Sequence, residues 1–197
     1  MKTKLTLLLN SIILVLFLSG CEFPHNGEEN FYREDGSLEQ RQTYKNGVFT
    51  KNEFFREDGN VEEITRYKNG IRFRDELYSE GGIVTHIQTF ENGIRSKLEQ
   101  YNKWDNLIQL DTYENGIQSK AEFFHEDGSV NQIQTYENGI RSKVEFYDED
   151  GVLRKVDTLE NGVLSKVEFY GEDGTLDEVD IYEDGEYKNS IEMKVVE

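Results

Sequence analysis

Three histidines and a recurring set of aspartates are the residues of this 197-residue chain whose types could bind a metal. His25, His86 and His125 share no local motif with one another or with the single Cys, so they do not form a zinc pattern. The aspartates precede glycines at intervals of 23 residues or multiples of 23, but the sequence has neither the β-roll nor the EF-hand calcium signature. Asp before Gly is also what a tight turn requires, so we expect no metal and no cofactor. These aspartates are Asp35, Asp58, Asp127, Asp150 and Asp173.

Motifs for catalysis are missing from the sequence. It has no nucleophile elbow, no phosphate-binding loop and no His-Glu-x-x-His pattern. Carboxylates are so numerous that no pair for glycoside hydrolysis stands out. We therefore expect a protein that is not an enzyme and has no catalytic residues, with a glycan hydrolase as the least favoured alternative.

The charge balance is strongly acidic, with 40 Asp and Glu against 22 Lys and Arg and a formal net charge of −18. A surface of this sign repels phosphate backbones, so we expect no nucleic-acid partner. Apolar residues make up 36% of the chain and aromatic residues 12%. That composition argues against disorder, since disordered chains are poor in aromatics, and also against a thick globular core.

The single Cys has a specific context. Lys2 and Lys4 precede an apolar run from Leu5 to Leu18, which is too short to span a bilayer comfortably and is typical of a signal peptide. The run ends in Leu18-Ser19-Gly20-Cys21, which resembles the lipobox of bacterial lipoproteins. That resemblance implies a diacylglyceryl group on Cys21 and cleavage of residues 1–20. The membrane would then be a partner through this lipid.

Residues 21–30 are expected to form the lipidated Cys and a tether. Loss of residues 1–20 removes two lysines and no acid, so the mature chain carries 20 bases and 40 acids, a net charge of −20. Glu22 follows the Cys, where an Asp would favour retention in the inner membrane under the lipoprotein sorting rule. We expect a lipid-anchored protein of the bacterial cell envelope, at the outer membrane or surface if the source is Gram-negative.

Seven units of 23 residues, without insertions, cover residues 31–191. Each unit contains two turn signals separated by alternating segments rich in Ile, Val, Thr, Phe and Tyr, which predict strands. Asn-Gly suits a two-residue type I′ turn, and Glu-Asp-Gly suits a three-residue loop that ends in a left-handed Gly. The turn-defining positions are Asn46-Gly47, Asn69-Gly70, Asn92-Gly93, Asn115-Gly116, Asn138-Gly139 and Asn161-Gly162, together with Gly36, Gly59, Gly128, Gly151 and Gly174. The last unit has Asp184-Gly185 in place of Asn-Gly, and the fourth has Asp105-Asn106 without the loop glycine.

The odd period predicts the register. A meander that returns each residue type to the same face needs one odd loop or one bulge per 23-residue unit, and the three-residue loop supplies it. Around Asn138-Gly139 we expect Thr135 opposite Ser142 and Ile133 opposite Val144. Around the loop Glu126-Asp127-Gly128 we expect Phe123 opposite Asn131. One face is then apolar, with Ile133, Thr135, Ile140, Ser142, Val144 and Phe146. The other is polar, with Val130, Gln132, Gln134, Tyr136, Arg141, Lys143, Glu145 and Tyr147.

These features predict an all-β fold: an elongated, single-layer, twisted antiparallel meander of seven hairpin repeats and about 14 strands, followed by a tail over residues 192–197. Basic residues such as Arg95, Arg141, Lys97, Lys143 and Lys166 are expected to pair with acids on the neighbouring strand. The apolar face would need cover from coiling, a dimer or a partner.

The recurring Tyr-Glu-Asn-Gly and Phe-Tyr-x-Glu-Asp-Gly resemble the variant MORN repeats of bacterial proteins, including the YwqK-type antitoxin-like group. The resemblance covers residues 31–191, and it implies a sheet of hairpins used for protein contact, lipid contact or assembly. The acidity of this chain argues against binding phospholipid headgroups.

We therefore expect a non-enzymatic module that presents an extended acidic sheet to a protein partner. Two alternatives are an immunity or antitoxin lipoprotein that neutralises a basic toxin, and a structural envelope protein that self-associates through its terminal strands.

Overall fold

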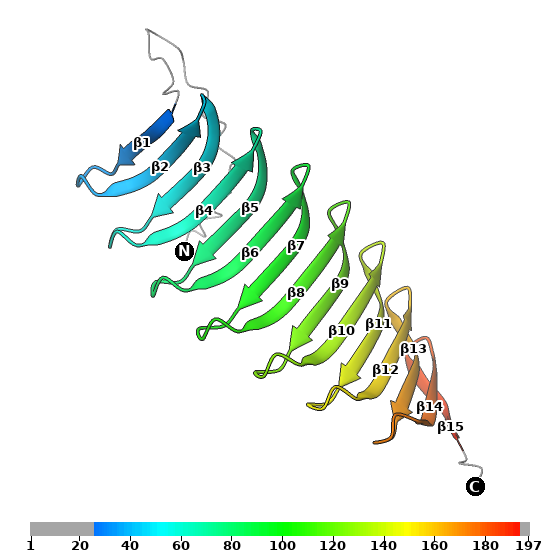
Figure 1. Ribbon diagram of the computed structural model, residues 1–197. Coiled ribbons are helices and arrows are strands. Elements are labelled where there is room, and N and C mark those ends of the chain that lie inside the picture. The colour runs from blue at the N-terminus through cyan, green and yellow to red at the C-terminus, as the bar shows by residue number, and fades with distance from the viewer. Residues whose placement is uncertain (1–25, 194–197) are drawn as a thin grey trace, which may run out of the picture.

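The computed structural model describes residues 26–193 and places them in a single open antiparallel sheet (Figure 1). Fifteen strands follow one another in chain order, each hydrogen-bonded to the next, which confirms the all-β meander. The strands are β1 (Asn26–Tyr32), β2 (Leu38–Lys45), β3 (Val48–Phe55), β4 (Val61–Lys68), β5 (Ile71–Tyr78), β6 (Val84–Glu91), β7 (Ile94–Tyr101), β8 (Leu107–Glu114), β9 (Ile117–Phe124), β10 (Val130–Glu137), β11 (Ile140–Tyr147), β12 (Leu153–Glu160), β13 (Val163–Tyr170), β14 (Leu176–Glu183) and β15 (Glu186–Glu192).

The first strand begins earlier than the sequence suggested. Residues 26–30 were expected to belong to a tether, but β1 begins at Asn26 and pairs with β2 along its whole length. The Asn26 side-chain oxygen accepts a hydrogen bond from the Asn46 backbone N–H at 2.9 Å. The sheet therefore has one strand more than the expected 14. The lipobox residues Leu18, Ser19 and Gly20, the lipidation candidate Cys21, and His25 lie outside the described residues.

The six Asn-Gly pairs from Asn46-Gly47 to Asn161-Gly162 form two-residue turns. Asn138 has φ of 52° and Gly139 of 80°, and both residues of the other five pairs and of Asp184-Gly185 also have positive φ. Asn tolerates this left-handed conformation at modest cost and Gly at none, which is why the pair suits a type I′ turn.

The Glu-Asp-Gly segments form three-residue loops. The His125 N–H donates to the Ser129 carbonyl at 2.9 Å, and the Gly128 N–H donates back to the His125 carbonyl at 3.0 Å. Gly128 has φ of 88°, as expected for a left-handed residue that ends the loop. In the unit without the loop glycine, Asp105 takes this conformation, with φ of 65°.

The register shows that the expected cross-strand pairs were wrong beyond the first residues of each hairpin. β10 and β11 start in the expected register, with Glu137 opposite Ile140, but Thr135 faces Lys143 because Ser142 forms a bulge. A second bulge, at Asn131, places Phe123 opposite Gln132. Equivalent shifts interrupt every pair of neighbouring strands from β1 to β15. A bulge bends the strand and increases its twist.

The bulges also change the composition of the two faces, because an extra residue moves the following side chains to the other side. The lysine face combines Thr135 and Ile133 with Lys143 and Glu145, whereas the phenylalanine face combines Gln134 and Gln132 with Val144 and Phe146. Hence neither face is the continuous apolar surface that the sequence suggested.

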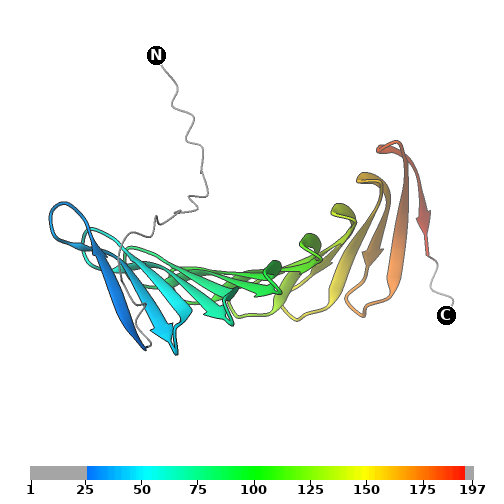
Figure 2. The same ribbon diagram turned by 90° about the horizontal axis from the view of Figure 1, so that it is seen from above.

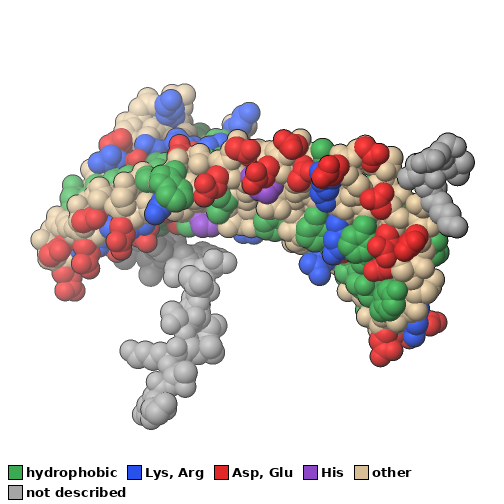
Figure 3. Space-filling model, turned by 90° about the horizontal axis from the view of Figure 1, so that it is seen from below, with side chains coloured by type: hydrophobic (Ala, Val, Ile, Leu, Met, Phe, Trp, Pro, Cys, Tyr) green, Lys and Arg blue, Asp and Glu red, His purple; other side chains and the backbone are tan. Residues whose placement is uncertain are grey.

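Small and β-branched residues are buried along the middle of both faces. On the phenylalanine face Ala121 and Val144 are 1% and 3% exposed, and on the lysine face Val156 is 4% exposed. Long neighbouring side chains cover these residues with their apolar stems, which lets a single layer exclude water on both sides. The resulting sheet is strongly curved and twisted (Figure 2). Apolar side chains lie in separate patches among charged ones on the face shown in Figure 3.

Candidate functional site

The histidines are not brought together among the described residues. His86 lies within β6 and His125 directly after β9, and both are half-buried rather than exposed. The His86 Nδ1 atom lies 3.1 Å from the Thr85 hydroxyl. Within residues 26–193 no group of three or more His, Cys, Asp or Glu side chains could hold a metal ion.

The loop aspartates mainly bind their own turns. The Asp127 carboxylate accepts hydrogen bonds from the Ser129 N–H at 2.8 Å and the Ser129 hydroxyl at 2.6 Å. These two bonds lower the pKa of Asp127 below its usual 3.8. Asp35, Asp58 and Asp173 make equivalent bonds to the residue two positions on. In the sixth loop Asp148 takes this role and accepts from the N–H groups of Asp150 and Val152.

A row of ion pairs follows the lysine face. Lys143 Nζ lies 2.7 Å from Glu145 Oε1, two residues further along the same strand. Lys51, Lys97, Lys120 and Lys166 make the same pair with the Glu two positions on, at 2.9–3.1 Å. The expected pairing of these lysines across strands was therefore wrong. Arg95 and Arg141 belong to the opposite face, where the Arg95 guanidinium lies 5.5 Å from the centre of the Tyr113 ring.

The second unit carries a denser charged cluster on the lysine face. Glu76 is 8% exposed, and its carboxylate contacts Arg66 at 3.1 Å, Arg74 at 2.7 Å and the Tyr78 hydroxyl at 3.0 Å. Burial alone would raise the pKa of Glu76, but hydrogen bonds from these three groups outweigh it and lower the pKa. Both Glu76 carboxylate oxygens accept hydrogen bonds, so the cluster is best interpreted as structural.

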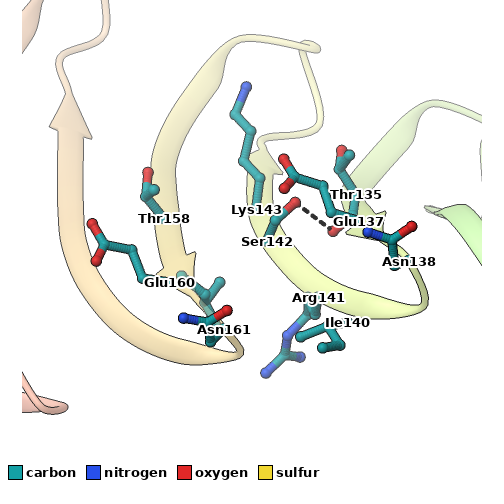
Figure 4. A pocket seen from close by; sticks show the side chains of 11 residues that line it. Thr135, Glu137, Asn138, Ile140, Arg141, Ser142, Lys143, Thr158, Glu160 and Asn161 are labelled. Carbon is teal, nitrogen blue, oxygen red and sulfur yellow. Dashed lines mark hydrogen bonds between the residues drawn. The ribbon is translucent and has the colours of Figure 1, made fainter.

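The lysine face also contains a repeated shallow pocket near the Asn-Gly turns. One pocket, of about 580 Å³, lies between β10, β11 and β12, beside the turns at Asn138 and Asn161 (Figure 4). Lys143 and Ser142 lie near Thr135 on one hairpin, while Thr158, Glu160 and Asn161 line the pocket from the next (Figure 4). A second pocket, of about 790 Å³, occupies the equivalent place one repeat further on.

The bulge serine is a structural residue that the sequence analysis did not identify. The Ser142 hydroxyl donates to the Thr135 carbonyl at 3.3 Å, across the point where the ladder is interrupted (Figure 4). Ser96, Ser119 and Ser165 repeat this bond at 3.1–3.3 Å. A hydroxyl residue stands three positions after five of the seven turn glycines, and it was the available signal, since a short polar side chain can replace a missing backbone partner.

Comparison with known families adds one finding. The family model described as MORN repeat variant matches residues 26–46 and 117–138. Both segments run from the strand before a Glu-Asp-Gly loop to the next Asn, so they fall in the same phase of the 23-residue repeat. The matches support a MORN-repeat protein. No curated protein sequence matches the chain.

Several solved structures share only a limited likeness with this sheet. Accessory secretory protein 1,2 and 3 in Streptococcus pneumoniae is 18% identical over 49% of this chain, with a TM-score of 0.38. The TarM mutant of S. aureus, in complex with fondaparinux, alpha-GlcNAc-glycerol and UDP, is 12% identical over 53%, with a TM-score of 0.41. The chain spans only 18% and 21% of the length of these two proteins. A porin-like protein from Bacteroides uniformis is 10% identical over 81% of this chain and 84% of its own, with a TM-score of 0.26.

In residues 26–193, no helix has the length and apolar character needed to cross a membrane.

Proposed function

We propose that this chain is a lipid-anchored, non-enzymatic repeat protein that binds another protein at the bacterial cell envelope. The repetition of one shallow pocket and one set of side chains along the lysine face supports this proposal. A surface that repeats without a distinct reactive centre suits contact with a long partner better than turnover of a small substrate. The sheet offers no uncovered apolar face to such a partner, because the bulges mix apolar and charged residues on both faces.

Lipid anchoring is the first part to test. The chain has one Cys, so fatty acids carried by a diacylglyceryl group on a cysteine sulfur report on Cys21 alone. We expect the wild-type protein to incorporate an alkyne fatty acid in metabolic labelling and to partition into the detergent phase. Cys21→Ser should lose both the label and the partitioning. Equal partitioning of the two proteins would refute anchoring through this residue.

Partner binding is the second part. Tagged full-length protein, expressed in its native host, is solubilised from the envelope, and co-purifying proteins are identified by mass spectrometry. Each candidate is then purified and titrated against the chain. A stoichiometric and saturable complex is expected. If no candidate binds saturably and the purified chain instead cleaves an envelope glycan, the non-enzymatic proposal is wrong.

A role as an immunity or antitoxin lipoprotein is the second candidate function, and the exposed acidic loops favour it. Glu126 and Asp127 at one loop and Glu149 and Asp150 at the next are exposed, and their charge suits a basic toxin. Deletion of the gene should then cause self-intoxication that a second deletion, of the partner, suppresses. Healthy growth of the single deletion strain under conditions that express the partner would exclude the immunity role.

A further inference from the structure

The two pockets on the lysine face are parts of one groove. They share Thr158, Glu160 and Asn161, which line the first pocket from one side and the second from the other. The groove therefore runs across the strands, along the edge of the sheet that carries the Asn-Gly turns. Its known part extends from β10 to β14, and the same residue types recur in the preceding units.

An apolar ridge borders this groove. The residue directly after the turn glycine is Ile or Val in the first six units, and these side chains remain 44–51% exposed: Val48, Ile71, Ile94, Ile117, Ile140 and Val163. Each of the last five also packs against the next turn, so a Cβ on the following turn glycine would lie 3.1–3.8 Å from its methyl group. The ridge is thus continuous from Ile71 to Val163, and about half of each side chain is available for contact.

A row of charges accompanies the ridge, because the residue opposite each ridge position is charged. Glu91, Glu114, Glu137 and Glu160 face Ile94, Ile117, Ile140 and Val163. All four are exposed, and within residues 26–193 none has an ion-pair or hydrogen-bond partner. In the first two units the equivalent residues are Lys45 and Lys68, which face Val48 and Ile71. The row therefore changes sign between the second and third unit.

The spacing of the row limits the shape of an occupant. Neighbouring ridge residues are two strands apart, which is about 9.6 Å in a β-sheet. An α-helix would need about 6.4 residues per step, which is not a whole number of turns. A β-strand needs about three residues, an odd number that turns successive side chains to opposite faces. A polyproline II segment rises about 9.3 Å per three residues and returns every third side chain to the same side.

From these observations we propose that the groove binds an extended, polyproline II-like segment of a partner protein with a three-residue repeat of apolar and charged side chains. Apolar residues meet the ridge, lysines or arginines meet the four unpaired glutamates, and acidic residues meet Lys45 and Lys68. This inference rests on the proposed protein-binding function and specifies the chemistry and polarity of the segment. An occupant of uniform charge fits only part of the groove.

The test uses synthetic peptides and the full-length, detergent-solubilised chain. The block peptide contains Pro-Leu-Glu twice followed by Pro-Leu-Lys four times, and a second peptide has the blocks in reverse order to cover both chain directions. The control peptide has the same triplets with the Glu and Lys triplets interspersed. Fluorescence anisotropy measures each affinity. One block peptide should bind at least about fivefold more tightly than the interspersed peptide, because only a block peptide pairs all of its charges.

Protein variants then locate the site. Glu114→Gln combined with Glu137→Gln should weaken the better block peptide about fivefold, since it removes two exposed ion pairs. The matched control combines Glu34→Gln with Glu172→Gln, which makes the same charge change at exposed positions on the opposite edge. The control should change affinity less than twofold.

Three results would overturn the groove assignment: equal affinity for block and interspersed peptides, equal loss in both pairs of variants, or no peptide binding. Equal loss in both pairs of variants is the result expected if the chain attracts basic peptides only through its net charge. No peptide binding is the result expected if the chain binds a glycan instead. If an envelope partner is still captured at full stoichiometry by the Glu114→Gln and Glu137→Gln protein, protein binding stands and the groove is not its site.

Discussion

The turn glycines provide a sharp test of how neighbouring repeats contact each other. Gly139 and Gly70 occupy the same position of an Asn-Gly turn and have similar φ angles of 80° and 77°. A Cβ at Gly139 would lie 3.2 Å from the Ile117 Cγ2 atom, whereas a Cβ at Gly70 would have no neighbour within 4 Å. Gly139→Ala therefore adds a backbone strain and a contact, while Gly70→Ala adds the strain alone.

The expected magnitudes follow from these two terms. A left-handed conformation costs an L-residue about 1–2 kcal/mol, which both variants incur. The close contact forces the half-exposed Ile117 side chain away from its preferred rotamer, at a further cost of about 0.5–1.5 kcal/mol. We expect Gly70→Ala to lower the free energy of unfolding by about 1 kcal/mol and Gly139→Ala by about 2 kcal/mol.

Urea denaturation of the full-length protein, followed by circular dichroism, measures both changes. Adding Ile117→Ala to Gly139→Ala removes the methyl group in contact and should recover about 1 kcal/mol relative to the sum of the single changes. Ile117→Ala should leave the effect of Gly70→Ala unchanged. If Gly139→Ala and Gly70→Ala cost the same, the ridge residues do not couple successive turns and our account of this edge is wrong.

Three further outcomes are expected. Ser142→Ala should cost about 1 kcal/mol in urea denaturation, because the Thr135 carbonyl loses its donor at the bulge. Arg72→Gln should cost about 3 kcal/mol, since the Asp75 carboxylate is fully buried beside it, and adding Asp75→Val should restore most of the loss in thermal melts. Hydrogen bonds from Ser129 lower the pKa of Asp127, so its stabilising contribution is complete above pH 3.8 and is lost as the pH falls below that value. Asp127→Asn should accordingly reduce the drop in the urea midpoint below pH 3.8.

The turns and strands could be predicted from the sequence because their causes are local. Asn138-Gly139 needs only its own two positive φ angles, and Asp127 satisfies the loop through Ser129, two residues away. The beginning of β1 could not be predicted in the same way. Asn26-Gly27 resembles a turn signal, and the segment becomes a strand because β2 offers it an unpaired edge.

The bulges escaped prediction for a different reason. Parity arguments test the repeat period, and one bulge in each of the two hairpins of a unit leaves the period at 23 residues. A meander with two bulges per unit and one with none are therefore equally consistent with the repeat. Only the pairing partner distinguishes them: Thr135 faces Lys143 rather than Ser142. The error then spreads to every later residue, since a shift of one position exchanges the faces.

This exchange of faces changes what the sheet can do. A register without bulges would place Ile133 with Val144 and leave an apolar surface in need of cover. The observed register places Ile133 beside Glu145, whose carboxylate Lys143 neutralises at 2.7 Å. Each face then contains its own narrow apolar row covered by long polar side chains, so the layer is complete without a second layer. Four glutamates that have no partner within residues 26–193 lie beside the turns, and one of them, Glu137, borders the groove. Recognition by this protein is therefore expected to depend on salt and on the order of charges in the partner, and only secondarily on buried apolar area.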